Sequence, residues 1–156
     1  MDTEPVVDLS NYSSLPRFED GSIDYTNADH APVLMCFVQH LGKILLLKRK
    51  NGRWDVITGY IDRPQPLKEK ALDGLAEDLG LEENQIKRFV FVAPYDYVDA
   101  ATGKTWTSYP ALSEVKKKPE IPLDGEYTEA VWIRPSEVVE YMTVPGLEAT
   151  LLKILS

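Results

Sequence analysis

The stretch from Gly59 to Leu81 contains the residues of this chain whose types and spacing could do chemistry. Apolar residues recur there every four positions and predict a helix with one apolar face: Leu67, Ala71, Leu75 and Leu79. Four acidic residues lie off that face: Glu69, Asp73, Glu77 and Asp78. Carboxylate oxygens are the ligands that hard cations such as Mg²⁺ prefer. The pattern predicts a cation held beside a packed helix, and the competing interpretation is a solvated helix with charges on its wet side.

The predicted helix has a signal at each end. A turn with Gly59 leads through Pro64 to Pro66, which suits the first helical position because its missing N–H would be unpaired there. Gln65 or a nearby residue is expected to cap this start. Gly80 suits the left-handed position just past the end of a helix.

At these residues the stretch resembles the Nudix box of the Nudix hydrolases, G-x5-E-x7-R-E-U-x-E-E-x-G-U, in which U is aliphatic. The matching residues, in order, are Gly59, Leu75, the acidic pair Glu77 and Asp78, Gly80 and Leu81. The spacing is kept, but three family residues are replaced: Glu by Gln65, Arg by Asp73 and Glu by Gly74.

The resemblance implies a hydrolase that uses Mg²⁺ or Mn²⁺ to cleave a nucleoside diphosphate linked to another group. It implies that Glu77, Asp78 and the carbonyl of Gly59 bind the metal, with Glu77 among the catalytic residues. Positions 74, 77 and 78 share one face of a helix, so Gly74 removes one of three carboxylates. In parts of the family that carboxylate orients or deprotonates the water, so a base would have to come from elsewhere.

Glu126 and Glu129 are the candidates for this missing function. With Trp132 they match E-x-x-E-x-x-W, a spacing often seen after the Nudix box. In relatives, acids in this region ligate metal or supply the base. The alternative is surface charge before a core strand.

Two replaced positions carry structural expectations of their own. In the family, residues at positions 65 and 73 form an ion pair that braces the loop against the helix. Gln65 and Asp73 are expected to replace it with one hydrogen bond. A glycine inside a helix costs about 1 kcal/mol relative to alanine, so Gly74 is expected to admit a close neighbour.

Candidate substrate-binding residues lie on predicted strands. Arg49 ends an LLxxR-type strand, as in Nudix domains, and its planar fork could pair with phosphate oxygens. Tyr60 and Trp106 are candidates to stack on a base or another flat group. The alternatives are a surface strand residue for Arg49 and ordinary sheet aromatics for the other two.

Composition limits the class of protein. With 156 residues, 44% of them hydrophobic, the chain fits one domain with a sizeable core. Its net charge of −8 argues against a nucleic-acid partner, which favours a basic face. No apolar segment is long enough to span a membrane, and the acidic N-terminus has no signal-peptide pattern. The single cysteine, Cys36, excludes an intrachain disulfide, and these features together predict a cytoplasmic location.

The order of the predicted elements gives the fold class. Residues 1–30 are polar and are expected to form an arm on the domain of residues 31–156, with a short strand near Ile23–Tyr25. The same arm could instead mediate a homodimer. Strands flank the box helix, and helices from Pro135 through Tyr141 and over Gly146–Leu155 end the chain. This order predicts an α/β fold, a Nudix-like α/β/α sandwich with a mixed β-sheet.

Three functions remain open. The first is a Nudix-type hydrolase that cleaves a pyrophosphate bond in a nucleoside diphosphate derivative. The alternative is a catalytically degenerate Nudix domain that binds a nucleotide or a protein. A third is an enzyme of the same fold with other chemistry, since fold alone does not fix the reaction.

Overall fold

The central strand of the fold is β1 (His30–His40), which is buried along most of its length. In the computed structural model, which describes residues 4–123 and 125–156, it belongs to an eight-stranded sheet. The other strands are β2 (Lys43–Arg49), β3 (Trp54–Asp55), β4 (Ile57–Tyr60), β5 (Ile86–Phe91), β6 (Tyr95–Val98), β7 (Thr105–Val115) and β8 (Tyr127–Ile133). Their order is β3-β2-β1-β7-β5, with β4 on β1, β6 on β7 and β8 on β2. The β1–β7 pair is parallel and the other pairs are antiparallel, so the sheet is mixed.

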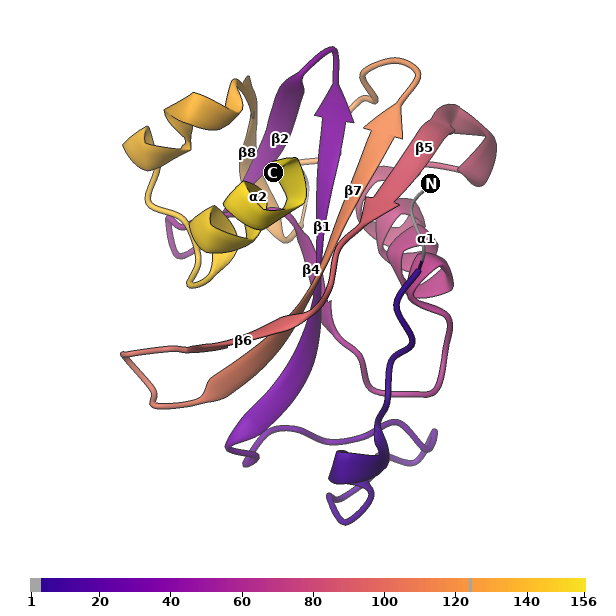
Figure 1. Cartoon of the computed structure of the whole chain (residues 1–156). Coiled ribbons are helices and arrows are strands. Elements are labelled where there is room, and N and C mark those ends of the chain that lie inside the picture. The colour runs from indigo at the N-terminus through magenta and orange to yellow at the C-terminus, as the bar shows by residue number, and fades with distance from the viewer. Residues whose placement is uncertain (1–3, 124) are drawn as a thin grey trace.

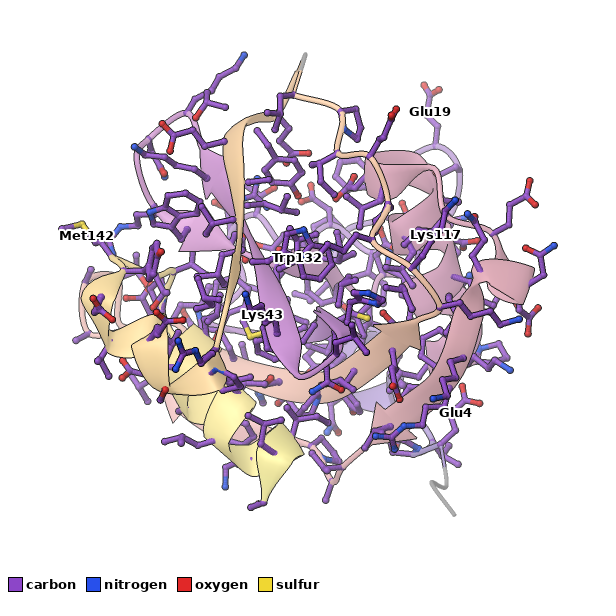
Figure 2. The ribbon with its side chains drawn as sticks, turned by 90° about the horizontal axis from the view of Figure 1, so that it is seen from above. Glu4, Glu19, Lys43, Lys117, Trp132 and Met142 are labelled. Carbon is purple, nitrogen blue, oxygen red and sulfur yellow. The ribbon has the colours of Figure 1, made fainter. Side chains whose placement is uncertain are left out.

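Two helices, α1 (Leu67–Leu79) and α2 (Leu147–Leu155), cover opposite faces of this sheet (Figure 1). Alternate residues of β1 enter different cores, as a pleated strand requires. Leu34 and Cys36 pack with the apolar face of α1, whereas Met35 and Phe37 pack with α2. Trp132, near the middle of the view from above in Figure 2, packs against the α1 core. The predicted α/β/α sandwich with a mixed sheet is confirmed.

Three short 3₁₀-helices join these elements: η1 (Ser10–Tyr12), η2 (Glu83–Gln85) and η3 (Pro135–Glu140). The α-helix expected from Pro135 through Tyr141 is therefore wrong, because the turn ends at Glu140 and Tyr141 is extended. Only Val138 of this segment is buried. One buried side chain gives an α-helix little tertiary packing to stabilise it.

The N-terminal arm packs on its own domain over residues 4–29, and residues 1–3 lie outside the described part. Its side chains form a third small core with the start of β1: Tyr12, Ile23, Tyr25 and Ala31. The backbone N–H of Ile23 donates to the carbonyl of Asp62 (2.8 Å), and the hydroxyl of Tyr25 donates to that of Ile61 (2.7 Å). Ile23 makes a single bridge with Arg17 instead of the strand expected near it. The arm thus holds the segment that follows β4.

The C-terminal end of α1 matches the end predicted from the sequence, whereas its N-terminal end does not. Gly80 is left-handed (φ 66°, ψ 21°) and ends the helix, as predicted. Pro66 is extended (φ −56°, ψ 138°) and precedes the first helical residue, so the first position predicted for it is wrong. At this start Glu4 of the arm accepts a hydrogen bond from the backbone N–H of Lys68 (2.6 Å). The carboxylate also lies where the helix dipole favours negative charge.

The described helices are too short or too polar to cross a membrane. Within residues 4–123 and 125–156, none is long and apolar enough to cross a bilayer.

Candidate functional site

A cleft of about 560 Å³ lies between α1 and the segment that runs from β4 to the start of that helix. The three residues predicted to bind metal, Gly59, Glu77 and Asp78, all line it. Gly59 comes from β4, which pairs with β1, and the two acids come from the last turns of α1. The sheet and helix therefore bring the two ends of the box together at one cleft.

The brace between loop and helix has the form expected from the sequence. The side-chain amide of Gln65 donates to Oδ2 of Asp73 (2.7 Å) and to Oε1 of Glu69 (3.3 Å). One amide thus joins two carboxylates across the start of α1. A neutral-to-charged hydrogen bond replaces the family ion pair at these positions.

Gly74 has the close neighbour that its place in a helix predicts. A Cβ atom added to it would lie 2.8 Å from Cγ2 of Ile57. Ile57 belongs to β4 and is only 2% exposed. Its γ-methyl is attached to a branched Cβ with restricted rotation, so it cannot move aside cheaply. The packing of α1 on β4 therefore closes this position to a carboxylate side chain.

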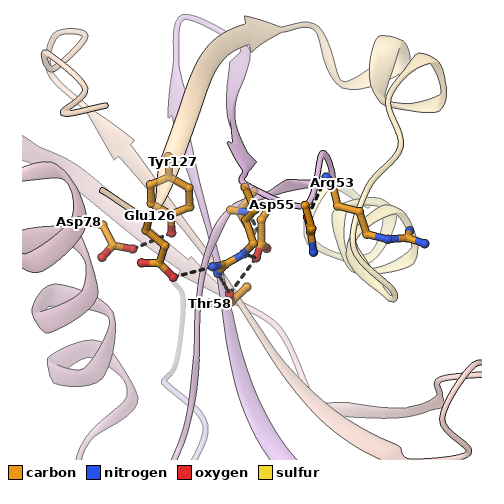
Figure 3. A network of polar contacts seen from close by, with 9 residues as sticks. Arg53, Asp55, Thr58, Asp78, Glu126 and Tyr127 are labelled. Atoms are coloured by element: carbon orange, nitrogen blue, oxygen red, sulfur yellow. Dashed lines mark hydrogen bonds and ion pairs between the residues drawn. The ribbon is translucent and has the colours of Figure 1, made fainter. Parts of the chain in front are cut away.

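Beside the cleft, Arg49 is the centre of a network of polar contacts with Asp55, Thr58 and Glu126, which Figure 3 labels. Its Nε donates to Oδ2 of Asp55 (2.6 Å) and its Nη1 to Oε1 of Glu126 (2.5 Å). The guanidinium also lies 5.4 Å from the ring centre of Tyr127. Burial opposes the charge, but the bonds to Asp55 and Glu126 outweigh it and raise the pKa of Arg49. Arg49 is thus engaged within the protein, and its contact with a substrate phosphate stays a prediction.

Asp78 joins this network to the box helix (Figure 3). The hydroxyl of Tyr127 donates to its Oδ2 (2.9 Å). Burial raises the pKa of Asp78; the bond from Tyr127 opposes this shift, and the charges of Glu126 and Glu77 add to it. Burial likewise raises the pKa of Tyr127. Glu126, Tyr127 at the start of β8 and the last turn of α1 therefore form one group of interacting side chains.

The two candidate acids after the box lie in different places. Glu126 faces Asp78 and Arg49, as Figure 3 shows. Glu129 pairs instead with Lys48 across the β2–β8 ladder (4.0 Å), and that ammonium lies 5.7 Å from the ring of Trp54 in the α2 core. The geometry does not support a role for Glu129 at the cleft beside α1.

The two aromatic candidates lie together. Tyr60 stacks on Trp106 with ring centres 5.6 Å apart and on Tyr25 of the arm with centres 5.3 Å apart. The ammonium of Lys104 lies 4.9 Å from the ring of Trp106 and 5.4 Å from that of Tyr60. Tyr60 keeps 40% of its surface exposed. Stacking of these two residues on a ligand stays a prediction.

The described side chains of this cleft do not by themselves form a ligand set for a resident divalent metal. Across the part of the chain that the structure describes, no three or more His, Cys, Asp or Glu side chains are placed to hold a metal ion. Gly74 offers no carboxylate, and Asp78 already accepts a hydrogen bond from Tyr127. The side chain of Lys70 lies against Gly59, where the resemblance expects a metal ligand. The predicted donors line one cleft without forming a ligand set.

Four residues of this region were missed as functional candidates from the sequence: Asp55, Thr58, Lys70 and Tyr127. Lys70 alone had a usable signal, since it precedes Gly74 by four residues and so shares its helix face. Tyr127 depends on its contact with Asp78, 49 residues away in the chain. Asp55 and Thr58 depend on how the turn after β2 brings them to Arg49, six and nine residues away.

Comparison with solved structures identifies the fold. A Nudix hydrolase from Nitrosomonas europaea has a TM-score of 0.63 and 16% identity, over 80% of this chain and 87% of its own. A MutT Nudix hydrolase from Burkholderia pseudomallei has a TM-score of 0.62 and 21% identity, over 81% and 98%. The Nudix domain of NrtR from Shewanella oneidensis, solved with ADP-ribose, has a TM-score of 0.63 and 14% identity, over 81% and 89%.

Sequence comparison adds no relative. No family model matches the chain, and no curated protein matches it. The structural likenesses all lie below 25% identity, so they concern the fold and leave substrate and reaction open. The TM-scores show that the arrangement of the mixed sheet and its helices is shared with these proteins: the chain has the Nudix fold.

Proposed function

We propose that this chain is a Nudix superfamily domain that binds a nucleoside diphosphate-type ligand in the cleft beside α1 without hydrolysing it efficiently. The observation that carries the proposal is the closure of position 74 by Ile57, which excludes the carboxylate that would orient or activate water. The ligand class is supported by the Nudix domain of NrtR, which shares the fold and was solved with ADP-ribose.

Each part of the ligand has a proposed partner. Lys70 and Arg63 are the basic side chains that line the cleft, so the phosphates are expected to lie near them. Tyr60 and Trp106 stack on each other outside the residues that line this cleft, and the base or another flat group would contact this aromatic pair. Arg49 would contact a phosphate from beside the cleft, and its bonds hold the carboxylates of Asp55 on β3 and of Glu126, just before β8, in place.

Isothermal titration tests this function. ADP-ribose, ADP, AMP and adenosine are titrated into the full chain in EDTA and again with Mg²⁺. We expect the two diphosphates to bind and adenosine to bind more weakly than either. Tyr60→Leu should weaken ADP-ribose binding by about tenfold, because base stacking contributes about 1–3 kcal/mol. Tyr141→Leu, which alters an aromatic contact with Trp54 in the other core, is the control. Absence of binding by every nucleotide would reject the proposal.

A second function, metal-dependent hydrolysis, is favoured by the charge of the cleft. Five carboxylates and two basic side chains line it among the described residues. A divalent cation such as Mg²⁺ or Mn²⁺ would offset this excess, and Glu126 lies near the acidic end. Release of product from nucleoside diphosphate derivatives with Mg²⁺ or Mn²⁺, lost in both Glu77→Gln and Glu126→Gln, would establish it. Lack of turnover across the panel would leave binding as the function.

Assembly and location remain proposals. A homodimer is expected to double the mass measured by light scattering, and deletion of residues 1–29 should abolish it if the arm mediates the contact. Fractionation of the source cells would test the cytoplasmic location.

A further inference from the structure

We propose that the ammonium of Lys70 is the built-in cation of this cleft, and that it takes the place of a divalent metal beside Gly59. The chain would then bind Mn²⁺ or Mg²⁺ weakly because a fixed positive charge already lies at the site. The proposal concerns metal binding by the ligand-free protein, so its test does not depend on whether the protein binds a nucleotide.

Lys70 lies on the face of α1 that lines the cleft. Residues 74, 77 and 78 follow residue 70 by four, seven and eight positions, so all four share this face. A Cβ atom added to Gly59 would lie 3.7 Å from Cε and 3.9 Å from Nζ of Lys70. The half-buried lysine stem therefore crosses from the helix to β4 and brings the ammonium against the glycine.

The space for this lysine depends on the residue one turn later. Gly74 has no side chain, and Ile57 closes the place of a Cβ atom there. No carboxylate from position 74 can therefore attract a metal or compete with the Lys70 stem for the cleft. Lys70, a basic residue, and Gly74, which replaces an acidic residue of the Nudix box, are four residues apart on the same face of the helix.

Among the described residues, the other basic side chains near the cleft are in ion pairs, whereas Lys70 is not. Arg63, the other basic residue of its lining, pairs with Asp20 (3.0 Å) and Asp62 (3.7 Å). Lys70 makes no ion pair within 4.0 Å in residues 4–123 and 125–156, although Lys68 on the same helix pairs with Glu83 (3.2 Å).

Carboxylates that line the same cleft favour the position of the ammonium there. Glu69, Asp73, Glu77 and Asp78 line the same cleft. Their summed negative charge attracts the ammonium as it would attract a metal ion. A divalent ion brought within a few ångströms of the ammonium would be repelled by it.

Titration of Mn²⁺ into the nucleotide-free full chain tests the proposal. Lys70→Gln is expected to bind Mn²⁺ at least about tenfold more tightly than the unmodified chain, because the repelling charge is removed. Lys68→Gln is the matched control, since it removes the same charge from the same helix at a residue that pairs outside the cleft. It should change Mn²⁺ affinity little. Lys70→Arg keeps the charge and should keep the weak affinity.

Two further measurements make the result decisive. Adding Glu77→Gln to Lys70→Gln should abolish the gained affinity, which places the ion in the cleft. Thermal unfolding of each variant checks its fold, and Lys70→Met, which keeps the apolar stem, replaces Lys70→Gln if that variant does not fold. Equal Mn²⁺ affinities for the Lys70→Gln and Lys68→Gln variants would overturn the proposal. So would tight Mn²⁺ binding by the unmodified chain that the Lys70→Gln change leaves unaltered.

Discussion

Gly74→Ala tests whether the packing of α1 on β4 closes the position of the missing carboxylate. In a solvent-exposed helix, this change stabilises by about 1 kcal/mol, because alanine has the higher helix propensity. Here the added Cβ atom would lie 2.8 Å from Cγ2 of Ile57. Contacts this short force a shift of side chain or backbone, and overpacking of a core typically costs about 1–3 kcal/mol.

The gain in helix propensity and the cost of overpacking oppose each other, and the burial of Ile57 indicates that the packing cost is larger. Ile57 is 2% exposed and β-branched, so the packing cost should lie in the middle or upper part of that range. The net expectation is a loss of about 1 kcal/mol in the free energy of unfolding. Gly74→Glu should lose more, because its longer side chain starts from the same clash.

Urea denaturation of the variants measures these energies. Ala76→Gly, at an exposed position of α1, measures the difference in helix propensity between alanine and glycine without a change in packing. Ile57→Ala removes the clashing methyl, so Gly74→Ala should be less harmful in that background than in the unmodified chain, as a double-mutant cycle would report. A Gly74→Ala variant more stable than the unmodified chain by about 1 kcal/mol would refute the reasoning, because propensity alone would then explain it.

The remaining predictions concern the supports of the site. Arg49→Met leaves the carboxylate of Asp55, 3% exposed, without its cationic partner and should cost about 3–5 kcal/mol by urea denaturation; a loss below about 1 kcal/mol would contradict this. Tyr25→Phe removes the bond to the carbonyl of Ile61 and should cost about 1–2 kcal/mol, and unchanged stability would show that the arm does not secure this segment. Burial raises the pKa of Asp78 above its ordinary 3.8, so its ionised form destabilises the fold above the raised pKa, and this penalty disappears below the ordinary value. Asp78→Asn should therefore be more stable than the unmodified chain at neutral pH and gain nothing in acid; a variant less stable at neutral pH would contradict the sign.

Local patterns predicted the architecture and the box helix well. The four-residue repeat of apolar residues located α1, and Gly80 gave its end because a left-handed residue favours glycine. The bond between Gln65 and Asp73 was expected from the resemblance to the Nudix box, in which residues at these two positions form an ion pair. A glycine inside a helix predicted a close neighbour, although only the structure identifies it as Ile57.

Contacts between distant segments were beyond such patterns. Glu4 accepts a hydrogen bond from the backbone N–H of Lys68, which lies 64 residues later in the chain. No sequence periodicity relates these two residues. The cap expected from Gln65 or a nearby residue was wrong, because the amide of Gln65 bonds Asp73 and Glu4 of the arm accepts from the helix start instead. The hydrogen bond between Tyr127 and Asp78, 49 residues apart, depends on how β8 meets α1.

The pair of candidate acids after the box shows what local geometry could have decided. Side chains three residues apart in a strand point to opposite faces. Glu126 and Glu129 could therefore not both face the cleft from one regular strand, and the structure has only Glu126 near Asp78. The irregular pairing of β8 with β2 at Lys48 and Arg49 adds a shift that the sequence does not reveal.

Titration of ADP-ribose in EDTA and in Mn²⁺, with analysis of the products, tests the central claim most directly. The account predicts binding in EDTA, little gain with Mn²⁺, and ADP-ribose recovered intact. Binding that requires Mn²⁺ and yields AMP with ribose 5-phosphate would contradict it, and would show that the cleft beside α1 holds a working metal centre despite Gly74.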